Sequence, residues 1–213
     1  MAVPPDNSKN KLLRSSSHLT GEGVVVDIGT GDGLFVYNSA RQNPQKFYIG
    51  IDANRSPLRK ISEKIHRKPA KGGLPNVLFL EGAVEELPEE LNQVADEVHI
   101  HLPWGSLLRA VATGDKSVLK DVRRICAPDA LLEVVIGSDS EKDRFEFERL
   151  GLQLWSGENL NSTVISNYKD SGFEIFEHGL LAPSEWPNLH TSWAKRLSGS
   201  ATRSLFYFIA RAV

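Results

Sequence analysis

The stretch Val24-Val-Val-Asp-Ile-Gly-Thr-Gly-Asp-Gly33 decides how this chain folds. Its first half is an apolar run of strand length, and its second half holds glycines at Gly29, Gly31 and Gly33. An apolar run that ends in a glycine-rich turn is typical of the first strand and first helix of an open α/β sheet. The glycines let the backbone turn sharply and approach a ligand where a side chain would collide.

Strand and helix patterns alternate along the rest of the chain. Strand patterns cover residues 24–28, 47–51, 77–80, 97–102, 130–136, 173–180 and 205–210. Helical patterns cover residues 33–40, 57–68, 116–126, 141–150 and 161–171. This alternation predicts an α/β fold with a mostly parallel sheet and helices on both faces. An insert joins the last two strands, which indicates the Rossmann-like class I methyltransferase version, whose seventh strand is antiparallel.

Length and composition bound the class of protein. With 213 residues, of which 40% are hydrophobic, we expect a single methyltransferase domain over residues 1–213. We expect residues 1–23 to be a short N-terminal extension, and residues 137–160 and 182–204 to be inserts near the active site. No apolar run approaches the roughly 20 residues of a membrane helix, and no secretion signal is visible. The lone Cys126 fits a reducing compartment, so we expect a cytoplasmic protein without a membrane partner.

Charge is distributed unevenly although the formal net charge is only −2. The segment Arg55–Lys71 holds seven Lys or Arg residues and a single Glu. The segment Glu81–Glu97 holds seven acidic residues and no Lys or Arg. Such asymmetry favours a basic patch that faces phosphates, although a basic, solvated helix face remains the alternative.

The glycine loop favours S-adenosylmethionine over a dinucleotide. Its spacing is Gly-x-Gly-x-Gly, whereas dinucleotide-binding loops carry Gly-x-Gly-x-x-Gly. Asp27 ends the first strand, where its carboxylate can oppose an ammonium or sulfonium charge. A pyrophosphate would be repelled by the same carboxylate. Asp27, Gly29 and Gly31 are therefore candidate cofactor-binding residues.

Two further acidic residues follow the next two strands. Asp52 ends the second strand and can accept hydrogen bonds from both ribose hydroxyls of a nucleoside. After the third strand, Val84 and Glu85 can flank an adenine ring. An open α/β sheet binds its ligand at the carboxyl ends of its strands, so these residues predict one nucleoside site.

The fourth strand ends in His101-Leu-Pro-Trp-Gly-Ser106. The segment after this strand lines the target pocket in base-modifying enzymes of this fold. Here Pro103 stiffens the turn, Trp104 offers a flat stacking surface, and Gly105 allows close approach. A tryptophan at a strand end is often a core residue, and that alternative stays open.

His99 and His101 alternate onto one face of the same strand. A pair of histidines with this spacing can bind a metal ion. The sequence offers no Cys-rich or His-rich partner set for them. We therefore interpret both as structural histidines that form hydrogen bonds in the core, and we expect no metal.

Five motifs in order resemble one known family. They are Asp27-Ile-Gly-Thr-Gly-Asp-Gly33, Tyr48-Ile-Gly-Ile-Asp-Ala53, Lys68-Pro-Ala-Lys-Gly-Gly-Leu74, Leu102-Pro-Trp-Gly-Ser-Leu-Leu108 and Ser192-Trp-Ala-Lys-Arg-Leu197. The chain resembles the kanamycin–apramycin resistance methyltransferases, which methylate N1 of adenine 1408 in 16S rRNA. The likeness runs from about Val24 to Arg203. Residues 1–23 depart from the family, which opens with an N-terminal hairpin and helix.

The resemblance implies a role for each matching position. The positions that would hold S-adenosylmethionine, beside Asp27 and Gly31, are Gly29, Asp52, Val84, Glu85, His101, Leu102, Pro103, Trp104, Gly105, Ser106, Thr191, Ser192 and Trp193. Trp104 and Trp193 would stack on both faces of the flipped-out adenine. The positions that would contact rRNA phosphates are Arg67, Lys68, Lys71, Arg196 and Arg203. The expected partner is 16S rRNA within the 30S subunit.

Two other functions remain open. A tRNA guanine-N7-type methyltransferase of the same fold normally carries Asp-Pro-Trp-Pro after the fourth strand, where this chain has Leu102-Pro-Trp-Gly105. A non-catalytic RNA-binding protein that kept the fold predicts a damaged cofactor loop, whereas Asp27, the glycines and Asp52 are all present. The adenine reaction itself needs no general base, because N1 of neutral adenine already carries a lone pair.

Overall fold

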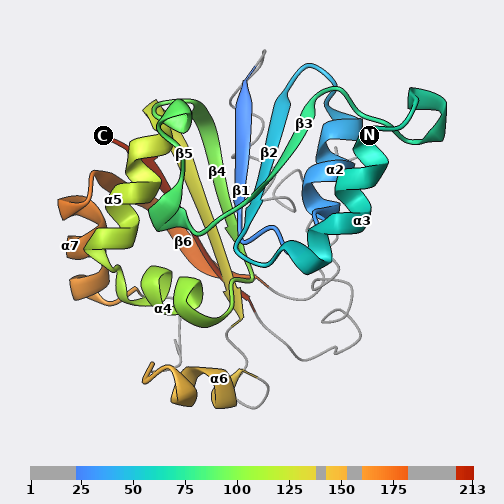
Figure 1. Cartoon of the computed structure of the whole chain (residues 1–213). Helices are drawn as coiled ribbons and strands as arrows, with labels where there is room; N and C mark the ends of the chain where they lie inside the picture. The colour runs from blue at the N-terminus through green and yellow to red at the C-terminus, as the bar shows by residue number, and fades with distance from the viewer. Residues whose placement is uncertain (1–22, 138–142, 153–159, 182–204) are drawn as a thin grey trace, which may run out of the picture.

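The structure is a computed structural model that describes residues 23–137, 143–152, 160–181 and 205–213 (Figure 1). The strands are β1 (Val24–Ile28), β2 (Phe47–Asp52), β3 (Val77–Glu81), β4 (Ala95–His101), β5 (Cys126–Gly137), β6 (Phe173–Leu181) and β7 (Leu205–Ala212). The α-helices are α2 (Leu34–Gln42), α3 (Arg55–Ile65), α4 (Gly105–Thr113), α5 (Lys116–Ile125), α6 (Arg144–Arg149) and α7 (Ser162–Asp170). Short 3₁₀ turns are η2 (Pro69–Lys71), η3 (Val84–Glu86) and η4 (Glu89–Leu91).

All seven strands form one sheet in the order β3-β2-β1-β4-β5-β7-β6. Every pair from β3 to β5 is parallel, and β7 runs antiparallel to both of its neighbours. The strand order reverses between β1 and β4, so the loops after these two strands diverge and leave a crevice at the carboxyl edge. The expected seven-stranded sheet with an antiparallel last strand is therefore confirmed.

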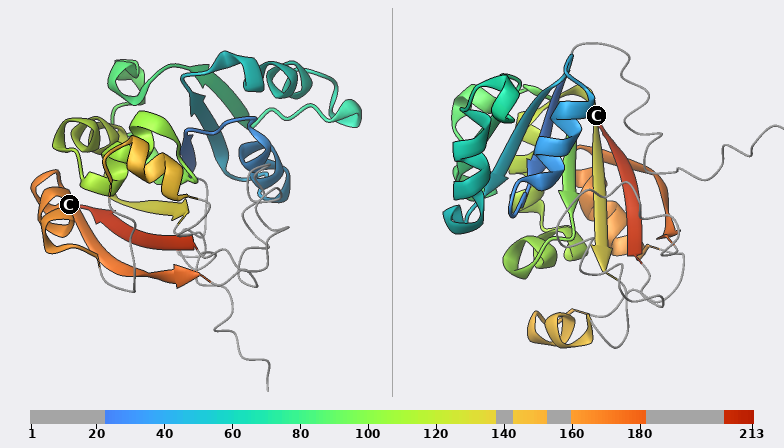
Figure 2. Two further views of the ribbon diagram at one scale, coloured as in Figure 1. Left: turned by 90° about the horizontal axis from the view of Figure 1, so that it is seen from below. Right: turned by 90° about the vertical axis from the view of Figure 1, so that its right-hand side faces the viewer.

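Helices pack on both faces of the sheet (Figures 1 and 2). Side chains alternate along each strand, so Val25 and Val26 enter different cores. Val25 packs with α2 and α3 over β1, β2 and β3. Val26 packs with α4, α5 and α7 in the larger cluster on the other face. These two cores hold the strand ends that build the site in fixed positions.

The helix boundaries follow local capping chemistry. The Asn54 side chain accepts a hydrogen bond from Ser56 N, so α3 begins at Arg55, two residues earlier than expected. Asn161 and Asp115 cap α7 and α5 in the same way. The sequence patterns missed α4, because Trp104 stands at its N-cap without a side-chain cap and Gly105 is a poor helix residue. None of the helices in the described ranges is long and apolar enough to span a bilayer.

Candidate functional site

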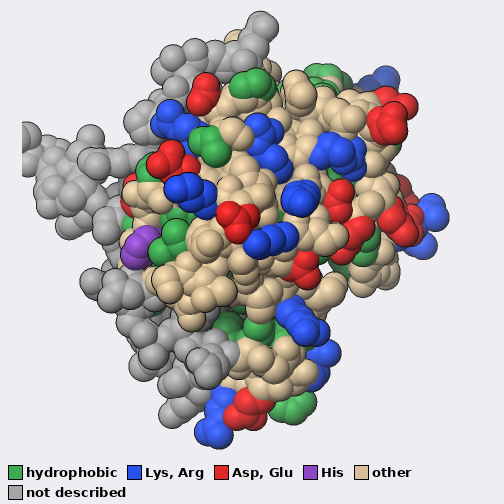
Figure 3. Space-filling view, turned by 90° about the vertical axis from the view of Figure 1, so that its left-hand side faces the viewer, with side chains coloured by type: hydrophobic (Ala, Val, Ile, Leu, Met, Phe, Trp, Pro, Cys, Tyr) green, Lys and Arg blue, Asp and Glu red, His purple; other side chains and the backbone are tan. Residues whose placement is uncertain are grey.

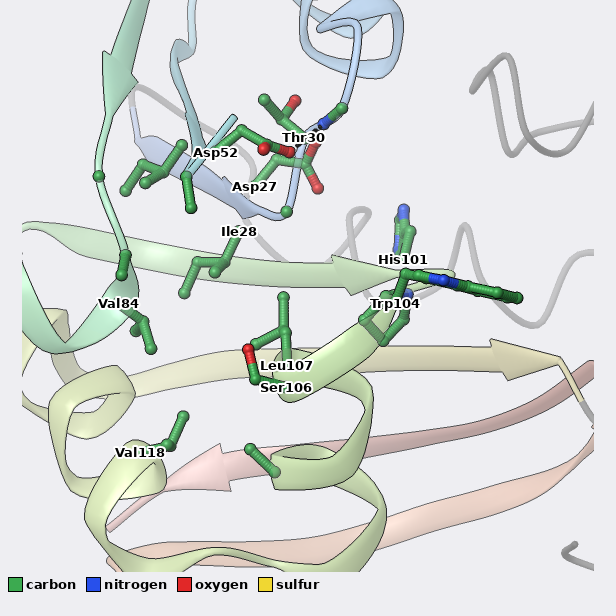
Figure 4. Close-up of a pocket in the computed structure, with 18 of the residues that line it drawn as sticks. Asp27, Ile28, Thr30, Asp52, Val84, His101, Trp104, Ser106, Leu107 and Val118 are labelled. Carbon is green, nitrogen blue, oxygen red and sulfur yellow. Dashed lines mark hydrogen bonds between the residues drawn. The ribbon is translucent and has the colours of Figure 1, made fainter. Parts of the chain in front are cut away.

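A pocket of about 270 Å³ lies at the carboxyl edge of the sheet, close to the lower limit of roughly 300 Å³ for ligand pockets (Figure 4). Its walls come from the loops after β1, β2, β3 and β4, and from α4 and α5. Figure 4 places Val84 on one side of the pocket and His101 and Trp104 on another, with Asp27 and Asp52 above. The pocket therefore lies at the reversal of strand order, where this fold binds ligands.

The glycine loop and Asp52 hold each other in place. Gly31 has a φ of 60°, and a Cβ at this position would meet no atom within 4 Å, so the backbone faces open space. Gly31 N donates to Asp52 Oδ2 at 2.7 Å, and Asn54 N donates to Asp52 Oδ1 at 2.8 Å. Each carboxylate oxygen keeps a further lone pair for a ligand. These two bonds fix the orientation of the Asp52 carboxylate at the wall of the pocket.

The segment after β4 turns sharply into α4. Leu102 adopts a φ of 51°, a left-handed conformation that is costly for a branched side chain. Leu102 N donates to Val135 O at 2.7 Å, which holds this turn against β5. At the start of α4, Gly105 N donates to Glu146 Oε1 at 3.1 Å, which joins α6 to the turn. Trp104, between these anchors, is 53% exposed at the edge of the pocket.

Asp27 lies buried at the end of β1. Burial raises the pKa of its carboxyl group, although nearby His101 acts in the opposite direction. The Thr30 hydroxyl also lowers the pKa of Asp27, but its Oγ1 completes no hydrogen bond within the described residues. A buried carboxylate with this environment is stabilised by a cationic ligand.

A buried network of charged groups lies beside the pocket. Lys46 Nζ contacts Glu97 Oε1 at 2.8 Å, and Glu97 Oε2 contacts His99 Nε2 at 3.3 Å. Glu133 Oε1 lies 3.2 Å from His99 Nδ1 and 2.7 Å from His101 Nε2. The sequence did not reveal Glu133 as the partner, because only the β4–β5 register places it opposite His99.

Hydrogen bonds between these groups account for their spacing. His99, His101 and Glu133 place three ligand atoms within 4.8 Å of one another, as a metal site would. Both nitrogens of His99, however, face carboxylates. Burial opposes the charge on His99, but its bonds to Glu133 and Glu97 outweigh burial and raise its pKa well above the usual range. The spacing of the three groups is thus that of a buried hydrogen-bond network, as expected for structural histidines.

A rigid turn after α3 presents three basic side chains. In the motif that includes Gly72 and Gly73, Gly73 N donates to Lys68 O at 3.2 Å. A Cβ at Gly73 would lie 1.7 Å from Arg67 O, so only glycine fits there. Arg67, Lys68 and Lys71 are exposed, and none forms an ion pair within the described residues. Arg67 and Lys68 follow α3, where a continuous helix to residue 68 was expected.

The structure places most of the predicted cofactor residues around one pocket. The lining includes Asp27, Gly29, Gly31, Asp52, Val84, Glu85, His101, Leu102, Pro103, Trp104 and Ser106. Gly105 is absent from the lining. Outside the described residues lie Thr191, Ser192, Trp193, Arg196 and Arg203. Lining residues that the sequence analysis missed include Thr30, Leu107, Ala110 and Val118. Had the sequence analysis predicted α4, Leu107 and Ala110 would have been recognised as apolar residues three positions apart, on one face of that helix.

Pocket chemistry fits a nucleoside that carries a cationic tail. Asp52 offers acceptors for paired hydroxyls, and the apolar Val84 lies beside the space for a base. Elsewhere in the same pocket, Thr30 Oγ1 and His101 Nδ1 make no hydrogen bond of good geometry within the described residues, and both side chains act on the Asp27 carboxylate. These are the groups that S-adenosylmethionine needs for its ribose, adenine and amino-acid parts.

Comparison with known proteins gives full-length matches. The family described as 16S rRNA (adenine(1408)-N(1))-methyltransferase matches residues 8–212. A 16S rRNA (adenine(1408)-N(1))-methyltransferase of Escherichia coli is 37% identical over 202 residues, which cover 94% of this chain and 91% of the relative. The crystal structure of the aminoglycoside resistance methyltransferase NpmB1 is 43% identical with a TM-score of 0.79, and covers 97% of this chain and 94% of its own.

Another similar solved structure contains the cosubstrate SAM. It is a tryptophan-to-alanine mutant of the 16S rRNA (adenine(1408)-N(1))-methyltransferase from Catenulisporales acidiphilia with the cosubstrate SAM. Its sequence is 30% identical and its TM-score is 0.81, with 98% of this chain and 92% of that chain covered.

Proposed function

Because the chain belongs to the 16S rRNA (adenine(1408)-N(1))-methyltransferase family and is an S-adenosylmethionine-dependent rRNA methyltransferase, we propose that it acts on adenine 1408 within the 30S subunit. Its family methylates N1 of this adenine and confers aminoglycoside resistance. The observation that supports the proposal most is the exposed Trp104 at the edge of the pocket that Asp52 and Val84 also line. An exposed aromatic plane at this position suits a base held outside its helix.

Residues at the carboxyl edge hold the methyl donor. S-adenosylmethionine supplies an electrophilic methyl group on a sulfonium. The Asp52 carboxylate, fixed by Gly31 N and Asn54 N, accepts the ribose hydroxyls. Val84 and Glu85 flank the adenine of the cofactor, and Asp27 faces its positive charges. The protein therefore contributes orientation and exclusion of water, which suffice for an attack by a lone pair that is already present.

The target adenine must leave its stack before N1 can react. Extrusion costs a few kcal/mol, and stacking on an aromatic side chain returns about 1–3 kcal/mol per base. Trp104 supplies one such surface, and Trp193 is proposed to supply the second. Two aromatic surfaces of this strength offset the cost of extrusion.

Docking on the subunit uses the basic turn. Arg67, Lys68 and Lys71 are held on one rigid loop and point away from the core. Their charges are available for phosphates because no carboxylate in the described residues pairs with them. Arg196 and Arg203 are proposed as further phosphate contacts.

One labelling experiment distinguishes the proposed rRNA substrate from tRNA, the substrate of the guanine-N7 alternative. The protein is incubated with methyl-labelled cofactor and, in parallel, with 30S subunits, protein-free 16S rRNA and bulk tRNA. We expect label in the 30S subunits and only background, set by a reaction without protein, in the other two. Label in tRNA would support the guanine-N7 alternative. Equal label in free 16S rRNA would refute the need for the assembled subunit.

A further inference from the structure

We infer that His101 binds the α-ammonium group of S-adenosylmethionine through the lone pair on its Nδ1 atom. The buried pair His99 and Glu133 holds His101 in the tautomer that this contact needs. The inference rests on the proposed function and deepens it, because it concerns how the cofactor is recognised.

The hydrogen bonds assign the tautomer. His101 Nε2 lies 2.7 Å from Glu133 Oε1, so it carries a proton and donates to that carboxylate. Bonds to His101 and His99 lower the pKa of Glu133 despite its burial, so the acceptor is ionised. When the single proton of an imidazole ring lies on Nε2, the lone pair lies on Nδ1. The proton position thus follows from the neighbours of the ring.

Neighbouring side chains hold the His101 ring in one orientation. His101 Nε2 lies 2.7 Å from Glu133 Oε1 and 3.3 Å from His99 Nδ1, so this nitrogen faces the buried network. The ring is also held sterically, because Phe35 packs against it edge-on at 4.8 Å between centroids.

Nδ1 of His101 lacks a partner although its side chain is almost fully buried. The residue is only 6% exposed, and Nδ1 makes no hydrogen bond within the described residues. A buried acceptor without a partner costs free energy, which a ligand that donates to it recovers. Since His101 lines the pocket, a bound ligand can supply that donor.

The groups around Nδ1 identify the donor as a cation. Asp27 and Thr30 lie on the neighbouring β1 end, next to β4 in the sheet, and line the same pocket (Figure 4). Thr30 Oγ1 is likewise buried and makes no hydrogen bond within the part of the chain that the structure describes. A carboxylate, a hydroxyl and an imidazole lone pair together match the three N–H groups of an ammonium ion. The sulfonium offers no N–H, and the ribose lies at Asp52.

The test compares three ligands by isothermal titration. They are S-adenosylhomocysteine, its analogue without the α-amino group, and its analogue without the α-carboxyl group. The variant is His101→Gln, because a glutamine amide reaches the Nε2 position, keeps Glu133 paired, and offers no acceptor at the Nδ1 position. We expect its melting temperature to stay within a few degrees of the parent.

The expected result is specific to the amino group. His101→Gln should weaken S-adenosylhomocysteine about tenfold, the lower end for a hydrogen bond to a charged group. The variant should weaken binding of the analogue without the α-carboxyl group by the same factor. It should change the affinity of the analogue without the α-amino group less than twofold. Asp52→Asn is the control for a shared contact and should weaken all three ligands by one factor. His178→Gln, at an exposed histidine, should change none.

Other outcomes overturn the inference. If His101→Gln weakens the deaminated analogue as much as the parent ligand, His101 does not contact the ammonium. If only the decarboxylated analogue escapes the loss, Nδ1 carries a proton and donates to the carboxylate. Binding of S-adenosylhomocysteine without methyl transfer to 30S subunits would refute the proposed substrate and leave the His101 contact intact.

Discussion

Replacing Arg67, Lys68 and Lys71 together by Glu is expected to abolish stable binding to the 30S subunit. The three side chains lie on one turn that backbone hydrogen bonds close, so they can contact neighbouring phosphates together. Reversing three charges replaces attraction by repulsion, and we expect a loss on the order of 100-fold or more. The slope of log K against log salt concentration should also become less negative by about 2–3. Each phosphate contact releases counterions, so the loss of three contacts makes binding less sensitive to salt.

Binding is measured by sedimentation or fluorescence at several salt concentrations. The matched control replaces Lys120, Lys169 and Arg211 by Glu, which changes the charge equally on exposed positions of α5, α7 and β7. Figure 3 shows the face that carries α5 and α7, where basic and acidic side chains are mixed. This control should bind subunits normally, and both variants should bind the cofactor as the parent does. If the first variant also binds subunits normally, the basic turn is only a solvated surface.

Trp104→Ala is expected to lose methyl transfer and keep the fold. The side chain is 53% exposed, so its removal should cost far less than the about 3–5 kcal/mol of a buried tryptophan. Loss of one stacking surface should cost about 1–3 kcal/mol, or roughly a 5- to 150-fold drop in transfer rate. The transfer rate of Trp104→Phe should lie between those of the parent and the Ala variant, because a smaller ring still stacks on the base.

Melting temperature, subunit binding and transfer rate are measured on the same preparations, with the same two changes at Trp193 as a parallel set. We expect melting temperatures and subunit binding close to those of the parent protein. The transfer rate should fall from the parent to the Phe variant and further to the Ala variant. A core role would instead lower the melting temperature of the Ala variant by roughly 6–20 °C. Activity that falls only in step with unfolding would move the target pocket elsewhere.

Local patterns predicted the sheet because its central strands β1, β4, β5 and β7 are buried on both faces. Apolar runs such as Val24–Ile28 and Ala130–Ile136 carry this signal without any knowledge of their neighbours. The pattern was weaker at the start of β5, where a register shift lets Cys126 pair with Ala95 before the apolar run begins. There the strand extends through exposed Pro128 and Asp129, which look like a turn in the sequence.

Side-chain partners on neighbouring strands could not be predicted from the sequence. His99 and His101 looked like ordinary core histidines, and the structure satisfies His99 but leaves Nδ1 of His101 without a partner. Glu133 is 34 positions from His99, and only the register of β4 on β5 joins them. Asp52 shows the opposite case, because its place at a strand end already indicated a carboxylate in the pocket. Position along a strand is thus visible in sequence, whereas pairing between strands is not.

Reverse transcription is the most direct test of methyl transfer to adenine 1408. Purified 30S subunits are incubated with the protein and S-adenosylmethionine, and a primer is then extended along the 16S rRNA. Methylation at N1 blocks base pairing, so we expect a strong, cofactor-dependent stop immediately before adenine 1408. The Trp104→Ala variant should give a much weaker stop at the same place. No stop, or a stop at any other nucleotide, would contradict the account.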